Sequence, residues 1–236
     1  MESIEGEAPM PKIRGDDGGG PRQPDPALFV QPLGQDAGST GQVGLLIRLG
    51  RQEEAFALYR HLCAAGAATL EDHREASELL FSLALYEEAL DACEQAIALD
   101  PEDCLLQENH GTTLAMLGRH EEALVSYQRA CECGSAIQPL MWMNFGTGLR
   151  VLGRAEAALL LYEKGMALHP PPAQAIVLLT SKGDALRDLG RYADAARAFD
   201  AALRIAQQLP PEAEDWPGPD VLNYLTAARE QVYAFS

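Results

Sequence analysis

The sequence predicts an all-α protein, a solenoid of about four to five antiparallel helix pairs with a C-terminal capping helix. The main observation is one pattern that recurs five times, at intervals of 34, 34, 35 and 37 residues. Its copies begin at Leu49, Leu83, Leu117, Leu152 and Leu189. A period of this size is typical of repeat proteins, in which each unit stacks on the next. Apolar residues recur within each copy at helical spacing, and proline or glycine falls where turns are needed.

Three regions are expected along the chain. Residues 1–38 are acidic and rich in glycine and proline, so they bury too little apolar surface to offset the entropy of ordering, and we expect a disordered arm. One apolar island in the arm, PALFVQPL at 26–33, either docks on the solenoid or on a partner, or is plain linker. Residues 39–208 form the predicted repeat domain. Residues 209–236 form a linker and the capping helix, for which Asp220 is a candidate N-cap.

Each unit of the repeat domain is predicted to be a pair of helices joined by a tight turn. The first unit is atypical, because its first helix, GQVGLLIRL, is short, and the second unit lacks the glycines of the others. In the last three units the first helix carries a glycine and a leucine on one face. These pairs are Gly111 and Leu114, Gly146 and Leu149, and Gly183 and Leu186.

Small and large residues alternate on one face of the second helix of each unit. An alanine stands six residues after the first leucine of every copy, and a large residue follows four positions later in four copies, with Cys93 in the second. Small residues let a neighbouring helix approach closely, and the large side chain fills the space beside them. The alanines are Ala55, Ala89, Ala123, Ala158 and Ala195, and the large residues are Tyr59, Tyr127, Tyr162 and Phe199.

Composition excludes several classes of function. The net charge of −17 repels phosphate backbones, so no nucleic-acid partner is expected. No run of 18 apolar residues and no signal peptide is visible, so we expect no membrane insertion. Five cysteines at irregular positions suit a reducing compartment better than a disulfide framework, which favours a cytoplasmic protein.

The repeated residues resemble the tetratricopeptide repeat family over about residues 41–208. The fourth unit carries the most of that family's motif, in Trp142, Phe145, Gly146, Leu149, Gly153, Ala158, Tyr162, Gly165 and Pro170. The resemblance implies a right-handed superhelix whose concave face, lined by the first helix of each pair, binds peptide segments.

Matching this chain to the positions that face the groove in the family predicts the peptide-binding residues. The groove centre would be mostly apolar, with two asparagines and two threonines, and its ends charged. Asn109 and Asn144 match the position from which asparagines of the family bond a peptide backbone, and an amide can donate and accept at once. The alternative is that both are simply solvated on an exposed face. The predicted groove residues are Leu105, Glu108, Asn109, Thr112, Met116, Leu140, Met143, Asn144, Thr147, Arg150, Val151, Ser181 and Asp184.

Charge is distributed unevenly along the repeats. Residues 70–103 hold eleven acidic groups and one basic group, whereas residues 139–206 hold six acidic and eight basic groups. Either the acidic run at 70–103 is a solvated surface, or it forms an acidic end of the groove that steers a basic ligand segment. The clamp by which some family members hold acidic chaperone tails needs lysine or arginine. The matching positions here are Glu108, Met143 and Val177, so such a tail is not the expected partner.

No chemistry for catalysis, metal binding or a cofactor is visible in the sequence. Cys131 and Cys133 are the only close cysteine pair, with no further ligands nearby, and the five histidines are scattered. We therefore expect no enzyme, no metal and no cofactor. The favoured hypothesis is a scaffold or adaptor that binds a basic or apolar segment of a partner protein. The alternative is a dedicated chaperone that shields an apolar segment of a client. The sequence does not predict the oligomeric state.

Overall fold

The computed structural model describes residues 41–133, 138–211, 213 and 216–234; the predicted arm and its apolar island lie outside this range. Within it the chain forms eleven helices and no strand. They are α1 (Gln42–Arg48), α2 (Gln52–Ala64), α3 (Leu70–Ser82), α4 (Tyr86–Leu99), α5 (Cys104–Met116), α6 (His120–Glu132), α7 (Pro139–Val151), α8 (Ala155–Ala167), α9 (Pro172–Asp188), α10 (Tyr192–Gln208) and α11 (Gly218–Tyr233).

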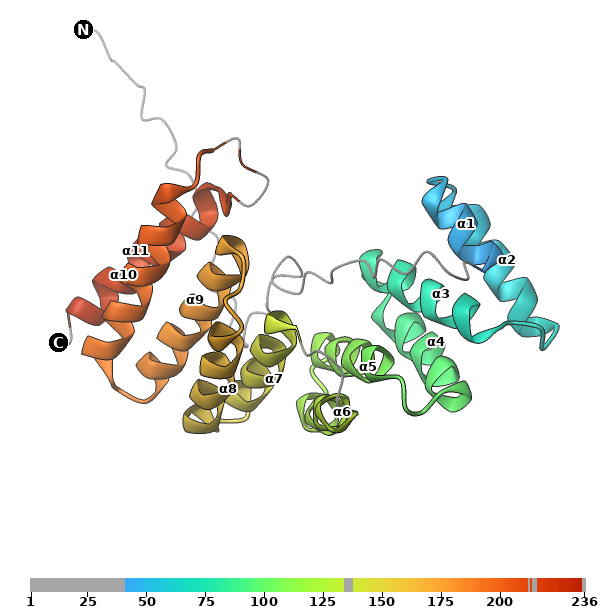
Figure 1. The fold of residues 1–236 in the computed structure, drawn as a ribbon, viewed down its shortest axis with the longest axis horizontal. Coiled ribbons are helices and arrows are strands. Elements are labelled where there is room, and N and C mark those ends of the chain that lie inside the picture. Colours follow the sequence, from blue (N-terminus) through green and yellow to red (C-terminus); the bar gives the residue numbers. More distant parts are fainter. Residues whose placement is uncertain (1–40, 134–137, 212, 214–215, 235–236) are drawn as a thin grey trace, which may run out of the picture.

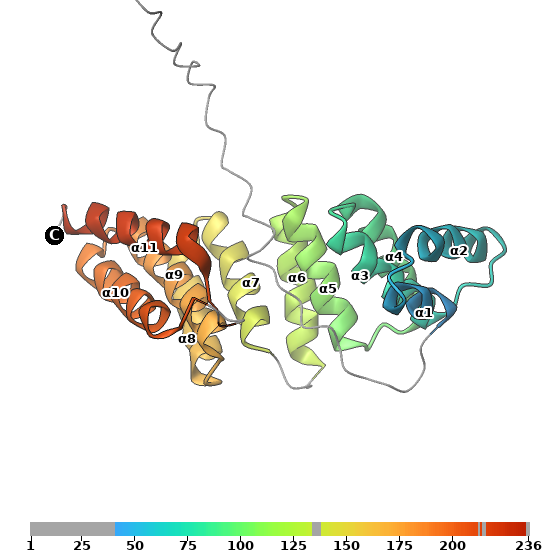
Figure 2. The same ribbon diagram turned by 90° about the horizontal axis from the view of Figure 1, so that it is seen from above.

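The helices form five antiparallel pairs that follow an arc (Figure 1). The odd-numbered helices α3, α5, α7 and α9 lie on the inner side of the arc, and their even-numbered partners lie on the outer side (Figure 1). Seen from above, the pairs stack in chain order from α1 at one end to α10 and α11 at the other (Figure 2). The predicted all-α solenoid with a closing C-terminal helix is confirmed.

The predicted alternation of small and large residues accounts for the close packing of each pair. The five repeated alanines are fully buried, as are Tyr127, Tyr162 and Phe199. Each of these three rings lies against a glycine of the preceding helix. A Cβ atom on Gly146 would stand 2.6 Å from the Tyr162 ring, and one on Gly183 would stand 2.5 Å from the Phe199 ring. The glycines therefore make room for the rings, as close packing of interiors requires.

The turns between paired helices use the left-handed backbone region where the sequence has glycine. Gly118, Gly153 and Gly190 have φ of +75°, +74° and +69° at the turns of the last three pairs. Glycine adopts this region without steric cost. In the second pair the turn residue is Ala84 with φ of 58°, because this copy has Leu-Ala in place of Leu-Gly. The same turn is therefore built with backbone strain in the second pair.

Helix starts are fixed by polar side chains in the acidic part of the chain. Thr69 and Asp72 form a capping box at the start of α3, and the side chain of Asp103 accepts hydrogen bonds from two backbone N–H groups at the start of α5. The prediction that Asp220 caps the last helix was wrong. Helix α11 begins two residues earlier, at Gly218, and carries a proline in its first turn, where the ring's fixed φ suits a helix start.

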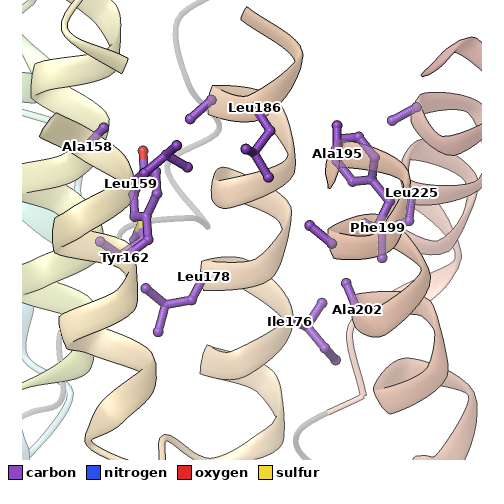
Figure 3. Close-up of a cluster of buried hydrophobic side chains, with 14 of the residues drawn as sticks. Ala158, Leu159, Tyr162, Ile176, Leu178, Leu186, Ala195, Phe199, Ala202 and Leu225 are labelled. Carbon is purple, nitrogen blue, oxygen red and sulfur yellow. The ribbon is translucent and has the colours of Figure 1, made fainter. Parts of the chain in front are cut away.

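Hydrophobic side chains of the last two pairs and α11 form one continuous core. Helix α11 contributes Leu225, Ala228 and Val232, which are buried in the same cluster as Tyr162 and Phe199. Figure 3 shows Leu225 beside Phe199, in the place where a further repeat would pack. The capping helix thus covers an apolar surface that the fifth pair cannot cover itself. No helix in the described part of the chain combines the length and the hydrophobicity needed to cross a bilayer.

Replacing Ala158 with leucine is expected to lower the free energy of unfolding by about 1–3 kcal/mol, because the added atoms have no space in the interface. The measurement is urea unfolding followed by circular dichroism. Ala167→Leu is the matched control, since Ala167 is exposed on the same helix. Equal midpoints for the two variants would show that the assigned packing stripe is wrong.

Candidate functional site

The predicted groove residues lie on three helices of the inner side, α5, α7 and α9. They differ in accessibility, which the sequence did not show. Leu105 and Val151 are exposed, and five residues are half-buried, namely Glu108, Thr147, Arg150, Ser181 and Asp184. The other six are buried: Asn109, Thr112, Met116, Leu140, Met143 and Asn144.

Thr112 is the centre of a polar network that connects two repeats. Its hydroxyl donates to the backbone oxygen of Glu108 at 3.0 Å and accepts from the Tyr127 hydroxyl at 3.3 Å. The side-chain amide of Asn144, on the next inner helix, donates to the same Thr112 oxygen at 3.4 Å. Since α5, α6 and α7 each contribute a residue, the network holds the third and fourth pairs in register.

The same position of the inner helix carries a related bond in the next two pairs. Thr147 lies 3.4 Å from the Tyr162 hydroxyl, which reproduces the bond between Thr112 and Tyr127. In the fifth pair the large residue is Phe199, which has no hydroxyl. Asp184 instead accepts from the hydroxyl of Tyr224 in α11, at 2.7 Å. Helix α11 therefore supplies the polar partner as well as the apolar cover.

Asn144 has an acceptor that no group in the described part of the chain satisfies. Its Oδ1 atom is buried and lacks a hydrogen-bond partner there, while its amide nitrogen is the one that reaches Thr112. The side chain of Asn144 is 5% exposed and that of Asn109 is 4% exposed, so the alternative of two solvated asparagines was wrong. A buried, unsatisfied carbonyl oxygen costs about 1–3 kcal/mol, and a donor that reached it would remove that cost.

Burial shifts the acid–base behaviour of the inner side. It raises the pKa of Glu108 and of Glu75 to about 7, because both carboxylates lose solvation. The pKa of Glu78 is also raised, mainly by burial. These groups lie toward the acidic end of the arc, on α3 and α5. A ligand cation placed near them would favour their charged forms and lower their pKa.

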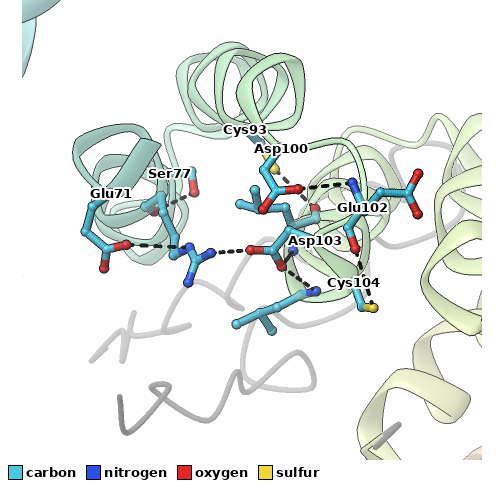
Figure 4. Close-up of polar contacts among 10 residues, drawn as sticks. Glu71, Ser77, Cys93, Asp100, Glu102, Asp103 and Cys104 are labelled. Atoms are coloured by element: carbon cyan, nitrogen blue, oxygen red, sulfur yellow. Dashed lines mark hydrogen bonds and ion pairs between the residues drawn. The ribbon is translucent and has the colours of Figure 1, made fainter. Parts of the chain in front are cut away.

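The charged groups at both ends of the inner side are partly paired within the protein. Arg74 forms ion pairs with Glu71 on its own helix and with Asp103 at the start of α5. Figure 4 shows Glu71 and Asp103 on either side of the guanidinium with which both form ion pairs. At the other end Arg150 binds Asp188 at 2.9 Å, and this pair joins α7 to α9. Arg150 and Asp103 therefore help to position neighbouring inner helices.

Three tyrosines make hydrogen bonds on the inner side that the sequence did not predict. Tyr127 and Tyr162 were assigned to packing alone, and Tyr224 was not singled out. Their hydroxyls orient the inner-side residues Thr112, Thr147 and Asp184. A usable signal was present in the two repeat tyrosines, because each stands 15 residues after the threonine that it contacts.

The described residues contain no group of three or more histidine, cysteine, aspartate or glutamate side chains that could hold a metal ion. All five cysteines lie in the described part of the chain, and none of them forms a disulfide there. Burial raises the pKa of the Cys93 thiol to about 12, so this sulfur is held in its unreactive protonated form. The reducing compartment inferred from the cysteines stays a prediction.

Comparisons with known proteins bear on the family. A sequence model of the tetratricopeptide repeat matches residues 73–103 and 177–209, which cover most of the second and fifth helix pairs. Comparison with curated proteins finds no match.

Solved structures of repeat proteins resemble the whole helical array. MamA has a TM-score of 0.64 at 18% identity, covering 72% of this chain and 97% of MamA. PilW, described as a widely conserved type IV pilus biogenesis factor, has a TM-score of 0.61 at 15% identity, covering 82% and 91%. TTC0263, a thermophilic TPR protein of Thermus thermophilus, has a TM-score of 0.56 at 17% identity, covering 79% and 94%. Two helix pairs match the tetratricopeptide repeat in sequence, and the helical array as a whole has the solenoid fold of these solved structures.

Proposed function

We propose that this protein is a non-catalytic interaction scaffold that binds an extended segment of a partner protein along the inner side of the arc. Binding would run through the predicted groove residues on α5, α7 and α9. The shared fold supports an interaction role but does not by itself define a ligand. The single observation that carries the proposal is the buried, unsatisfied Oδ1 of Asn144.

A peptide backbone is the ligand chemistry that suits this position. Because Oδ1 of Asn144 is buried, neighbouring side chains must move before a main-chain N–H of the ligand can donate to it. The amide nitrogen, which is already held by Thr112, can keep its bond when this happens. The bond to Oδ1 uses no side chain of the ligand, so it would fix the position of a segment regardless of its local sequence. Leu105, near the start of α5, and Val151, at the end of α7, are exposed and available for side-chain contacts.

The acidic end of the arc favours a ligand with a basic residue at one end. Glu78 and Glu108 face the inner side with raised pKa and form no ion pair within the described residues. A lysine or arginine of the ligand would restore the interactions that their carboxylates lost with water. The charge gradient along the arc would then set the direction in which the segment lies.

The chaperone alternative has less support than the scaffold. A client's apolar segment needs an accessible apolar surface, but Leu140 and Met143 are buried within the protein's own core. Only Leu105 and Val151 among the predicted groove residues are exposed apolar side chains. We therefore propose the scaffold, with recognition through the ligand's backbone.

The test begins with the partner itself. A photo-crosslinking amino acid at Leu105 in the full chain should capture the partner, and mass spectrometry of the crosslink would identify the bound segment. The same amino acid at Leu99, which is exposed on outer helix α4, is the control. Crosslinks formed only from position 99 would contradict an inner binding side.

Asn144→Ala is then expected to weaken binding of the identified segment about tenfold, because the variant loses the acceptor for the ligand's backbone. Isothermal titration calorimetry with the synthetic segment measures this effect. Asn223→Ala, which changes an exposed asparagine of α11, is the matched control and should leave affinity unchanged. An Asn144→Ala variant that is folded and binds with parental affinity would rule out the proposed contact.

A further inference from the structure

The outer side of the arc has a depression between the third and fourth helix pairs. It encloses about 560 Å³ and is bounded by α6 and α8, with α7 at its floor. Apolar side chains form most of it, including half-buried Leu124 and Phe145 and exposed Val125 and Leu160. This surface lies on the opposite side from the proposed peptide site, so it requires a separate explanation.

The equivalent positions between other pairs carry charged groups. Between α4 and α6, Glu94 lies 3.8 Å from His110, and between α8 and α10, Glu163 forms an ion pair with Lys182 at 3.0 Å. At the repeat positions that match these two pairs, the middle interface has Gln128 and Phe145. The apolar character of the depression is therefore specific to this junction and is not a property of the repeat.

Two residues above the floor of the depression expose much apolar surface. Leu160 is 63% exposed and Val125 is 52% exposed. They occupy equivalent positions in consecutive second helices, and the matching positions in the neighbouring units are Asp91 and Arg197. Clustered exposed aliphatic residues over an apolar floor are typical of a surface that another protein covers.

Charge on this part of the molecule is balanced, unlike the rest of the chain. Residues 117–166 contain five acidic and five basic residues, whereas the whole chain has a net charge of −17. Glu121 on α6 and Arg154 at the start of α8 both line the depression and are exposed. Neither forms an ion pair within the described residues, so both charges are available to a partner.

We propose that this depression is the contact surface for a second copy of the chain, related by a two-fold axis parallel to α6 and α8. A two-fold interface must be complementary to itself. Helices α6 and α8 run in the same direction, because each is the second helix of its pair. The axis then places α6 of one copy over α8 of the other, with the two helix starts together.

This arrangement pairs the charges as well as the apolar residues. Glu121 of each copy comes beside Arg154 of the other, so the interface gains two equivalent ion pairs. Val125 of each copy comes beside Leu160 of the other and covers the apolar floor. The remaining negative charge lies outside this region and is screened beyond about 8–10 Å at physiological salt. The same pairing would leave both inner sides free for their ligands.

The test is the oligomeric state of the full-length protein, measured by sedimentation equilibrium at concentrations up to about 100 μM. The parent is expected to dimerise in this range. Leu160→Arg should raise the dissociation constant at least about tenfold, whereas Leu99→Arg, at an exposed leucine of outer helix α4, should not change it. A monomeric parent, or equal dimerisation of these two variants, would overturn the proposal.

Charge reversal tests the proposed symmetry. Glu121→Arg alone and Arg154→Glu alone should each weaken the dimer, and the double variant should recover most of the parent's affinity because the pairs are re-formed with opposite sign. A double variant as weak as either single variant would overturn the two-fold arrangement. Both residues are exposed, so circular dichroism should show the same helix content in all variants. These outcomes are independent of the peptide titration on the inner side.

Discussion

Tyr162→Ala is expected to lower the free energy of unfolding by about 3–5 kcal/mol, the range for removing a fully buried aromatic side chain. The ring lies against Gly146 of the partner helix and belongs to the large core that joins the last two pairs to α11. Because Gly146 has no side chain, it cannot help to fill the resulting cavity. Each pair of a solenoid is stabilised by its neighbours, so loss of the fourth also weakens the fifth.

Tyr162→Phe separates packing from hydrogen bonding. It keeps the ring and removes only the 3.4 Å contact with Thr147, so we expect a loss of about 1 kcal/mol or less. The fifth pair already uses Phe199 at the matching position, which shows that the repeat accepts a ring without a hydroxyl. Urea unfolding followed at the helical circular dichroism band measures both variants. A Tyr162→Ala variant no less stable than Tyr162→Phe would contradict the packing argument.

The parts of the fold that depend on local spacing were predictable. Ala158 and Tyr162 lie four residues apart on one helical face, and that spacing was sufficient to place both in the core. Gly153 predicted a tight turn because few other residues adopt its backbone geometry without strain. Repetition strengthened these inferences, since the same residues recur at the same offsets in several units.

The accessibility of the inner side was not predictable in the same way. Whether Asn144 is solvated or buried depends on how closely α7 approaches α5, and its contact with Thr112 joins residues 32 positions apart. The family's position pattern placed both residues on the inner side but could not give that distance. The start of α11 was missed for a related reason, because helix boundaries vary by one or two residues around the strongest capping signal.

Glu108→Gln is expected to stabilise the protein at pH 8 by on the order of 2–3 kcal/mol, which would test the burial of this carboxylate directly. Burial raises the pKa of Glu108 from its ordinary value of 4.5 to about 7 in the folded protein. Between these values the folded state holds a proton that the unfolded state has released. The parent's free energy of unfolding therefore falls as pH rises through this window and levels off above it.

Glutamine resembles the protonated carboxyl, so the variant should lose this part of the pH dependence. At pH 4 both proteins carry a neutral group in the folded state, and their stabilities should nearly coincide. The difference should grow from about pH 4.5 to 7 and then remain constant. Urea unfolding at several pH values measures it, with Glu87→Gln as the control at an exposed glutamate of α4. The same pH profile for both substitutions would show that the Glu108 carboxylate keeps its solvation in the folded protein. A ligand cation would then have no lost solvation to replace at this position.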